Sequence, residues 1–239
     1  MSYLEIILPF SIPPAALAKQ LLAQMQAPAL AELLGHQKSA EHSHFDEFSR
    51  QLPHEAFLSR SVHQYEPEQS NSPPFAHKYL RDFGLPQNEG FWFCLNPVHF
   101  HVARDHLVMQ DQRRLAISDE ESRQLFETAH AICEEDGRTL LWGEAKHWFL
   151  RADDWAELKT ASLDAASGHN MEIWLASGAQ ARAWRRLQNE IQMEWHAHSV
   201  NQAREQMGER TINSVWLHSG SAQLPSMDFL VTAAPTPSC

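Results

Sequence analysis

The sequence predicts an α+β fold, in which a helical N-terminal portion precedes a mixed, mostly antiparallel sheet with helices packed on one face. After residue 75, the apolar patterns follow the order strand, strand, helix, strand, strand, helix, strand. Before residue 63, helical spacing dominates, and the segment QYEPEQSNSPP that follows is polar, proline-rich and without periodicity. We therefore expect a helical N-terminal portion over 1–63, a linker over 64–74, an α/β domain over 75–223 and a partly disordered tail over 224–239.

The N-terminal portion begins with a β-like apolar run over residues 3–10. Pro13 and Pro14 then favour the first turn of a helix, where a missing N–H costs nothing. A second short helix is expected to end at Gly35. Residues 45–58 predict two short helical pieces, because a proline interrupts their apolar pattern.

The strands of the sheet are predicted from short apolar runs that are bounded by turn residues. Asn96 and Pro97 are expected to turn the chain after the first run, and Gly143 is expected to turn it within a hairpin. Residues 163–170 are expected to form a loop. The expected strands or extended segments cover residues 91–95, 98–101, 107–109, 139–142, 147–150 and 212–217.

The helices of the same domain are predicted from start and stop signals. A short helix over 75–83 is expected to close at Gly84. Ser118 and Glu121 have the spacing of a capping box, so a longer helix is expected to begin there and to end near Gly137. A third helix has an apolar stripe spaced three, four and four residues apart. That stripe consists of Trp184, Leu187, Ile191 and Trp195.

The segment from Trp184 to Gly220 is the densest run of unusual residues in the chain, and it predicts a helix, a polar turn and a buried strand. Many of its polar residues, at the end of the helix and beyond, have planar side-chain groups that can form hydrogen bonds. Two interpretations stay open: these side chains cap the helix and fix the following loop, or they form a binding site. The residues are Asn189, Gln192, His198, Asn201, Arg204 and Asn213.

The composition excludes some classes of partner and indicates a compartment. The formal charge of −11 argues against nucleic acid and against an anionic membrane, because no basic stripe is present to neutralise phosphates. Cys94, Cys133 and Cys239 form no CxxC pair, which favours a reducing compartment. No apolar run approaches the roughly 20 residues that cross a bilayer, and the N-terminus does not resemble a signal peptide. We therefore expect a cytoplasmic protein.

Histidine pairs raise the question of a metal site. His99 and His101 are weak candidates, since a spacing of two on a strand puts both side chains on one face. A tetrahedral site needs three or four ligands, however, and only Asp105 lies nearby in the sequence. His196 and His198 would point apart on a helix. The expectation is therefore that the chain holds no metal and no other cofactor.

Motifs for nucleophilic catalysis and phosphate binding are missing from the chain. The sequence contains no GxSxG elbow, no GxxxxGK[ST] loop and no GxGxxG loop. Cys94 and Cys133 fall on apolar faces, where a cysteine acts as a small buried hydrophobe. No catalytic residue is therefore assigned, and the sequence favours a protein that is not an enzyme.

Arginines at the ends of predicted elements suggest a site for a planar anion, because a guanidinium binds phosphate or carboxylate with two parallel bonds. Arg104 and Arg151 are two such residues. Arg204, with Asn201, Asn213 and the flat ring of Trp216, would form a pocket for a small phosphorylated or carboxylated molecule. The alternative is that these arginines pair with carboxylates of this acidic protein.

The segment NEIQMEWHAHSVNQAREQMGERTINSVWLHSG resembles a motif found in two related groups of proteins. One is the RpfE-type regulatory protein family, often labelled cofactor-independent phosphoglycerate mutase. That resemblance covers nearly the whole chain, including the LPF opening, GFWFCLNPVHFHVARDHLVM and HWFLR. The other group is the archaeal-type cofactor-independent phosphoglycerate mutases. There, residues of about 95–220 resemble the small domain inserted into a metal-binding catalytic core.

The resemblance implies a ligand-binding role for the residues that match the motif. The chain departs from the mutases because it lacks their Asp- and His-rich metal motifs, and because Leu217 and His218 interrupt the usual WGxG ending. The resemblance therefore implies that this chain has the small domain of the mutases without their catalytic core. The resulting candidate ligand-binding residues are Asn201, Arg204, Asn213, Trp216 and Gly220 from the motif, with His198 and Arg104 added from the sequence pattern.

Three hypotheses about function follow. The first is a non-catalytic cytoplasmic regulatory protein that binds a small phosphorylated or carboxylic metabolite. The second is a metal-dependent phosphoglycerate mutase or related phosphotransfer enzyme. The third is a structural or protein-interaction module, which could bind a protein partner or form a homo-oligomer through its eight tryptophans.

Overall fold

A computed structural model describes residues 6–13, 15–40, 44–63, 68–86 and 89–222. The chain divides into two compact units, Met1–Phe45 and Asp46–Cys239. The expected linker over 64–74 therefore falls inside the second unit. Its described part is tied to that unit, since the Ser72 amide donates to the carbonyl of Thr160 at 2.8 Å. The tail expected over 224–239 lies outside the described residues.

The first unit contains the two expected helices, α1 (Ala15–Gln24) and α2 (Pro28–Gly35). Helix α2 begins at a proline and has no buried residue. The strand expected over 3–10 is wrong for its described part, residues 6–10, where Phe10 has a left-handed φ of 58°. An apolar run needs a pairing partner to become a strand, and none of the described strands pairs with this one.

The second unit begins with two helices, α3 (Pro53–His63) and α4 (Ala76–Asp82). Residues 45–58 were expected to form two helical pieces, but only the second forms. Pro53 starts helix α3 instead of interrupting a longer pattern, because its fixed φ suits the first helical turn. Helix α4 confirms the helix expected over 75–83, and Gly84 closes it with a φ of +64°.

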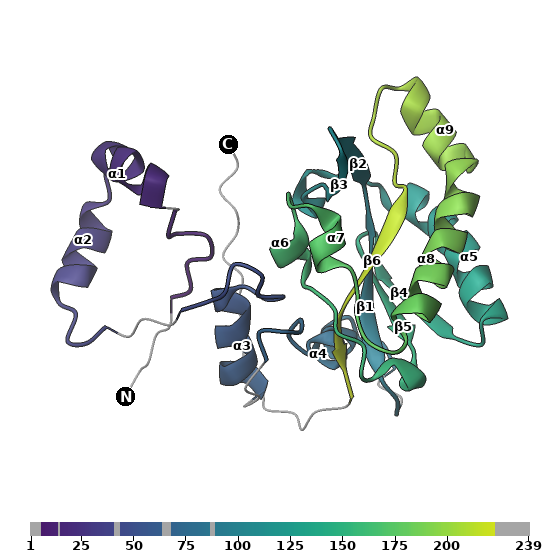
Figure 1. The fold of residues 1–239 in the computed structure, drawn as a ribbon, viewed down its shortest axis with the longest axis horizontal. Coiled ribbons are helices and arrows are strands. Elements are labelled where there is room, and N and C mark those ends of the chain that lie inside the picture. Colours follow the sequence, from purple (N-terminus) through teal and green to yellow (C-terminus); the bar gives the residue numbers. More distant parts are fainter. Residues whose placement is uncertain (1–5, 14, 41–43, 64–67, 87–88, 223–239) are drawn as a thin grey trace. The chain divides into compact units, whose positions relative to one another are not determined.

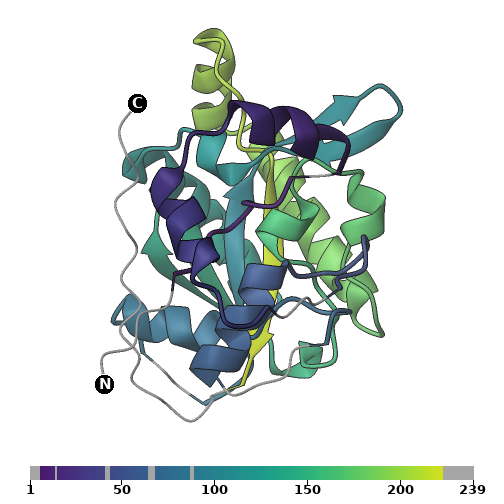
Figure 2. The same ribbon diagram turned by 90° about the vertical axis from the view of Figure 1, so that its left-hand side faces the viewer.

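The strands confirm an α+β fold with an antiparallel main sheet. This four-stranded sheet has the order β4-β5-β1-β6, and all its neighbouring strands are antiparallel. Strands β2 and β3 form a separate antiparallel ribbon, which projects beyond the main sheet in Figure 2. The strands are β1 (Trp92–Val98), β2 (Phe100–Ala103), β3 (His106–Met109), β4 (Thr139–Glu144), β5 (His147–Arg151) and β6 (Ser214–Ser221).

Two expected turns are wrong because the residues lie within strands. Asn96 and Pro97 continue β1, where they pair with Trp216 and Val215 of β6. Gly143 lies in β4, and the hairpin turns at residues 145–146 instead. A Cβ at Gly143 would come within 2.7 Å of the carbonyl oxygen of His147, so close packing accounts for this glycine.

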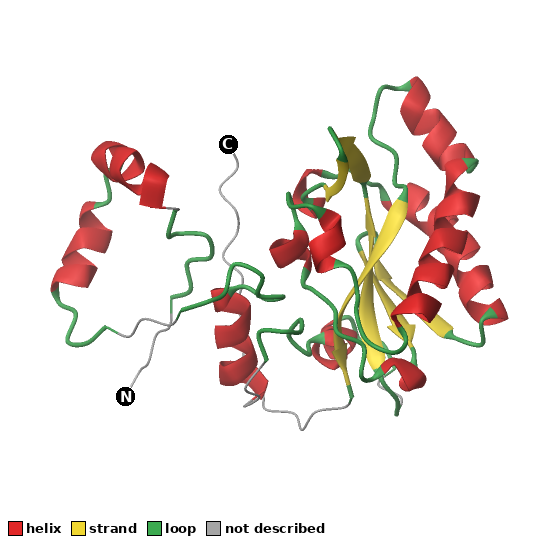
Figure 3. Ribbon diagram, in the orientation of Figure 1, coloured by secondary structure: helices red, strands yellow, loops and turns green. Residues whose placement is uncertain are grey.

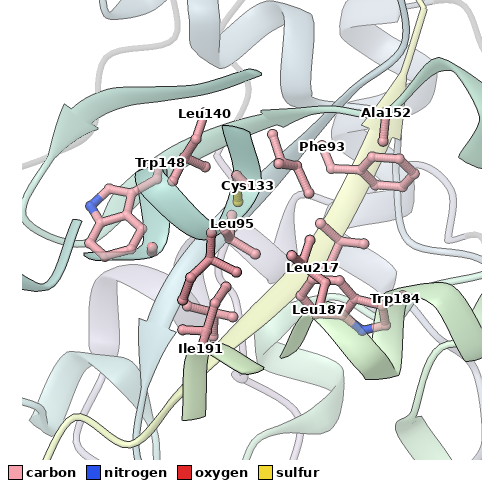
Figure 4. Close-up of a cluster of buried hydrophobic side chains, with 14 of the residues drawn as sticks. Phe93, Leu95, Cys133, Leu140, Trp148, Ala152, Trp184, Leu187, Ile191 and Leu217 are labelled. Atoms are coloured by element: carbon pink, nitrogen blue, oxygen red, sulfur yellow. The ribbon is translucent and has the colours of Figure 1, made fainter. Parts of the chain in front are cut away.

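The long helices α5 (Asp119–Glu135) and α8 (Ala181–His196) cover one face of the main sheet (Figures 1 and 3). The capping box predicted at the start of α5 is confirmed. The predicted stripe of α8 is also confirmed, since all four of its residues are buried. Figure 4 shows the resulting core, in which Leu187 and Ile191 pack with Leu95 and Leu217 of the sheet.

Short helices cover the opposite face of the sheet, so both faces are packed. Helix α4 contacts Trp92, Cys94 and Phe149. Helices α6 (Leu163–Ala166) and α7 (Met171–Trp174) pack near Val98 and Trp216. Helix α6 lies in the segment that was expected to be a loop. It forms because Ser162 caps it, accepting a hydrogen bond from the Ala165 amide at 3.2 Å.

Three further elements complete the second unit. Helix α9 (Ser199–Gln206) lies where the sequence predicted only a polar turn. The 3₁₀ turns η1 (Gln112–Arg114) and η2 (Asp153–Trp155) connect strands to the elements that follow. Among the described helices, none is long and apolar enough to cross a membrane.

Candidate functional site

Arg204 of helix α9 is the most densely bonded of the predicted site residues. Only 2% of it is exposed, and all its guanidinium nitrogens donate to protein atoms. Nη1 donates to Glu121 Oε1 at 2.7 Å, and Nη2 donates to the carbonyl of Ala116 at 2.6 Å. Nε donates to the carbonyl of Arg210 at 2.7 Å. Arg204 therefore joins α9 to the start of α5 and to the loop before β6.

The carboxylate that faces Arg204 belongs to the capping box of α5. Glu121 accepts hydrogen bonds from the Ser118 amide at 2.8 Å and from Arg204. Burial alone would raise the pKa of Glu121, but these hydrogen bonds hold it below its ordinary value. A second carboxylate, Glu209, lies 3.2 Å from Arg204 Nη1. Arg204 is therefore paired with two carboxylates of the protein itself, as the alternative interpretation expected.

Asn201 is buried nearby and ties the loop after α8 to the sheet. Its Nδ2 donates to the carbonyls of Trp195 and Ile212, each at 2.8 Å. Its Oδ1 accepts from the Ile212 amide at 2.7 Å. His198 acts as the N-cap of α9, since its Nδ1 accepts from the Val200 amide at 3.2 Å. Both residues therefore have bonds within the protein that explain their positions.

The remaining motif residues lie apart from this cluster. Asn213 exchanges two hydrogen bonds with the backbone of Phe100, each at 2.8 Å. The indole of Trp216 is buried and donates to the carbonyl of Ala161 at 2.8 Å. At Gly220, a Cβ would come within 2.4 Å of the Phe93 ring, so this position serves close packing. Of the three residues expected to form a pocket, only Arg204 lines the two cavities described below, and Asn213 and Trp216 do not.

The other predicted residues lie on or beside the β2–β3 ribbon, apart from Arg151. Arg104 is in the ribbon's turn, with a left-handed φ of 57°. His99 and His101 stack with ring centroids 6.0 Å apart, and His99 Nδ1 is 2.7 Å from the carbonyl of Thr211. No third metal ligand accompanies this pair among the described residues. Arg151 instead pairs with Asp153, 2.9 Å away.

Two adjoining cavities, of about 380 and 400 Å³, open beside Arg204. They share the residues Ala116, Arg204 and Glu209. The first is also lined by Gln110, Arg114, Leu115, Gly208 and Arg210. The second is also lined by Ile117, Ser118, Glu121, Lys146 and Met207.

Arg114 and Arg210 provide the first cavity with exposed positive charge. Neither forms an ion pair with a carboxylate in the described part of the chain. Their backbones are nevertheless fixed from inside the protein. The buried Gln110 side chain donates to the Arg114 carbonyl at 3.2 Å, and Arg204 donates to the Arg210 carbonyl at 2.7 Å. The two guanidiniums are therefore carried by an anchored backbone and remain available to an anion.

The electrostatics of neighbouring groups agree with a positive region at this edge of the sheet. Burial is the main cause that lowers the pKa of His99, and the charges of His101, Arg210 and Arg204 lower it further. Arg114 and Arg210 were missed in the sequence because Arg114 lies outside the resembling segment, and Arg210 lies within it but not among the residues that match the motif. The only local signal was the consecutive pair Arg113 and Arg114 after a strand.

No protein-family model and no curated protein matches the chain. Solved structures that are similar to it include the following two. The cofactor-independent phosphoglycerate mutase from Thermoplasma acidophilum DSM 1728 is 14% identical, with a TM-score of 0.45, over 71% of this chain and 47% of that one. The PH0037 protein from Pyrococcus horikoshii is 14% identical, with a TM-score of 0.38, over 76% of this chain and 39% of that one. The chain thus spans less than half the length of either protein.

Proposed function

We propose that this protein binds a small phosphorylated or carboxylic metabolite between Arg114 and Arg210, and that it acts in regulation through binding. The observation that supports the proposal is the pair of exposed guanidiniums, which flank a cavity of about 380 Å³ and form no ion pair within 4.0 Å among the described residues. Glu209 also lines this cavity, but its carboxylate lies 3.2 Å from Arg204 Nη1. A guanidinium offers two parallel donors to a phosphate or carboxylate.

The fixed backbone at both arginines supports binding of a small ligand. Gln110 and Arg204 hold the two carbonyls, so less chain freedom is lost when an anion is bound. Arg204 itself contributes positive charge at the cavity wall, but its donors are already occupied by Glu121 and two carbonyls. We therefore assign direct contact with the anion to Arg114 and Arg210, and a supporting role to Arg204.

A non-catalytic, cytoplasmic role belongs to the same proposal. The sequence carries none of the nucleophile or phosphate-loop motifs discussed above, and the cysteines described by the structure, Cys94 and Cys133, are unpaired and buried. Membership of the RpfE-type family stays a prediction from the sequence motif.

A thermal-shift screen with three-carbon phosphorylated acids tests the proposal. A ligand at a hundred times its Kd adds about 2.7 kcal/mol to the free energy of unfolding. We expect Arg114→Gln and Arg210→Gln each to weaken binding roughly tenfold to a hundredfold, because each removes charge-assisted hydrogen bonds. Arg182→Gln is the matched control. Arg182 is exposed on α8, and its substitution changes the net charge by the same amount away from the cavity.

The outcome separates the hypotheses. If the control and the cavity variants lose the same amount of stabilisation, the effect comes from net charge and the proposed site is wrong. If a phosphorylated acid is converted to an isomer during the experiment, the protein is an enzyme and the binding-only role is wrong. Arg204→Ala is unsuitable for this test, because removing one partner of a buried ion pair costs about 3–5 kcal/mol of stability.

A further inference from the structure

A second cluster of polar side chains lies apart from the arginine cavity, where helix α3 meets helix α6. His54 and Glu55 occupy the first turn of α3, and Asp164 is in α6. One ligand atom of each residue lies within 4.8 Å of the others. His54 Nε2 and Asp164 Oδ2 are 4.0 Å apart. All three residues are partly buried.

We propose that His54, Glu55 and Asp164 bind one divalent transition-metal ion. Imidazole with two carboxylates is a donor set that suits Mn²⁺, Fe²⁺ and Zn²⁺. Ligand atoms bound to one ion at about 2.1 Å lie at most about 4.2 Å apart. The His54–Asp164 separation of 4.0 Å is already within that limit, and every ligand-atom separation in the cluster is within 4.8 Å. Three protein ligands also leave positions open for water or for a substrate oxygen.

Glu55 supplies an independent reason for a cation at this place. Its Oε2 accepts hydrogen bonds from the Leu52 amide and from Ser162 Oγ, each at 2.7 Å. No lysine or arginine forms an ion pair with it in the described part of the chain. A partly buried carboxylate without a basic partner has a cost in lost solvation, and a bound cation would reduce that cost.

The surrounding residues hold the ligands in place, as groups around metal ligands commonly do. Ser162 both caps α6 and bonds to Glu55, so it fixes the spacing between the two helices. Arg113 Nη2 lies 3.0 Å from Asp164 Oδ1, which leaves Asp164 Oδ2 on the side of His54. Arg113 balances the negative charge of only one of the two carboxylates in the cluster. The other negative charge is therefore available to a cation.

Titration of the full chain with MnCl₂, followed by calorimetry and by the electron paramagnetic resonance of free Mn²⁺, tests the inference. Mn²⁺ is the probe because Zn²⁺ would also bind other members of the fifteen histidines. We expect one bound ion per chain. Glu55→Gln should weaken binding at least tenfold, and it can still accept both hydrogen bonds, so the fold is retained.

Glu144→Gln is the matched control, because Glu144 faces His147 at 2.7 Å without a third ligand in the described cluster. The inference is overturned if the wild-type chain binds no Mn²⁺, or if Glu55→Gln binds it as tightly as the wild type. Should Glu55→Gln fail to fold, Asp164→Asn replaces it, and undiminished binding by that variant has the same meaning. Because Arg114 and Arg210 take no part, failure here leaves the proposed anion site untouched.

Discussion

The two faces of the main sheet are built from the same strands but are stabilised by different interactions. On the face that α5 and α8 cover, Leu95, Trp148 and Leu217 pack in a large apolar cluster, beside one buried hydrogen bond from Gln188 to the carbonyl of Val215. On the opposite face, Asn96 and His218 form a buried hydrogen bond of 2.9 Å between β1 and β6. Alternation along each strand therefore separates a face held mainly by apolar contacts from one on which side chains of neighbouring strands are hydrogen-bonded to each other.

The polar face forms a connected network that extends beyond the sheet. His218 Nδ1 lies 2.8 Å from Ser219 Oγ, and the Ser219 amide donates to Ser72 Oγ at 2.8 Å. Asn96 also donates to the carbonyl of Lys146 at 2.6 Å. Apolar side chains do not titrate, so we expect only the stability that comes from this second face to depend on pH. The comparison can be tested by changing one face at a time.

The largest loss of stability is expected from Trp148→Ala on the apolar face. Trp148 is fully buried, and its ring contacts Phe126, Trp142 and Trp195. Removing a buried aromatic side chain costs about 3–5 kcal/mol, as a urea denaturation curve would measure. Val102→Ala is the control, since Val102 is 72% exposed and should change stability by less than about 0.5 kcal/mol. A loss of under 1 kcal/mol at Trp148 would contradict the described core.

A smaller effect is expected from acid on the polar face. Burial, and then the nearby charge of His147, lowers the pKa of His218 to about 3. The unfolded chain binds a proton near pH 6.5 and the folded chain does not, so stability falls as the pH drops below 6.5. Each pH unit below 6.5 lowers the free energy of unfolding by about 1.36 kcal/mol, so the loss from this histidine should reach about 3 kcal/mol at pH 4.5.

A series of denaturation curves between pH 7 and pH 4.5 measures this loss. His218→Gln should flatten the dependence, because it removes the titrating group. His130→Gln should leave the slope unchanged, because His130 lies on α5 and its ring is partly exposed. Equal slopes for the wild type and His218→Gln would show that the acid sensitivity arises elsewhere.

The smallest of the three effects is expected from Asn96→Ala. The variant leaves the buried Nε2 of His218 without its partner, while the carbonyl of Lys146 keeps only the hydrogen bond from Gln112. An unsatisfied buried polar group costs about 1–3 kcal/mol, so a loss of about 2 kcal/mol is expected. Chemical denaturation at pH 7 is the measurement. No change in stability would mean that the polar network does not contribute to holding β1 against β6.

Local signals in the sequence were enough to predict the long helices. The capping box at Ser118 and Glu121, and the apolar stripe of α8, depend on residues within one or two turns of each other. The turn expected at Asn96 and Pro97 was wrong for the opposite reason. These residues look like turn formers, but pairing with distant β6 keeps them extended. Tertiary pairing of that kind has no signal in the neighbouring sequence.

Prediction of the site was limited in the same way. The sequence drew attention to Asn201 and Arg204, but their bonding partners at Ile212 and Glu121 depend on the fold. Helix α9 was missed because its stability comes from these same bonds and not from an apolar stripe. Arg114 and Arg210 could not be associated before the cavity that they share was known. The arginine cavity and the His54 cluster are therefore properties of the tertiary structure.

The bonds of Asn201 also determine how the segment after α8 unfolds. One side chain holds the end of α8 and both backbone groups of Ile212, so it closes the ends of residues 197–211 into a loop. Arg204 then fastens the middle of this loop to α5. Local opening would have to break all these bonds together. The segment that looks like a connection in the sequence should therefore exchange its amide hydrogens in the same cooperative unit as the sheet.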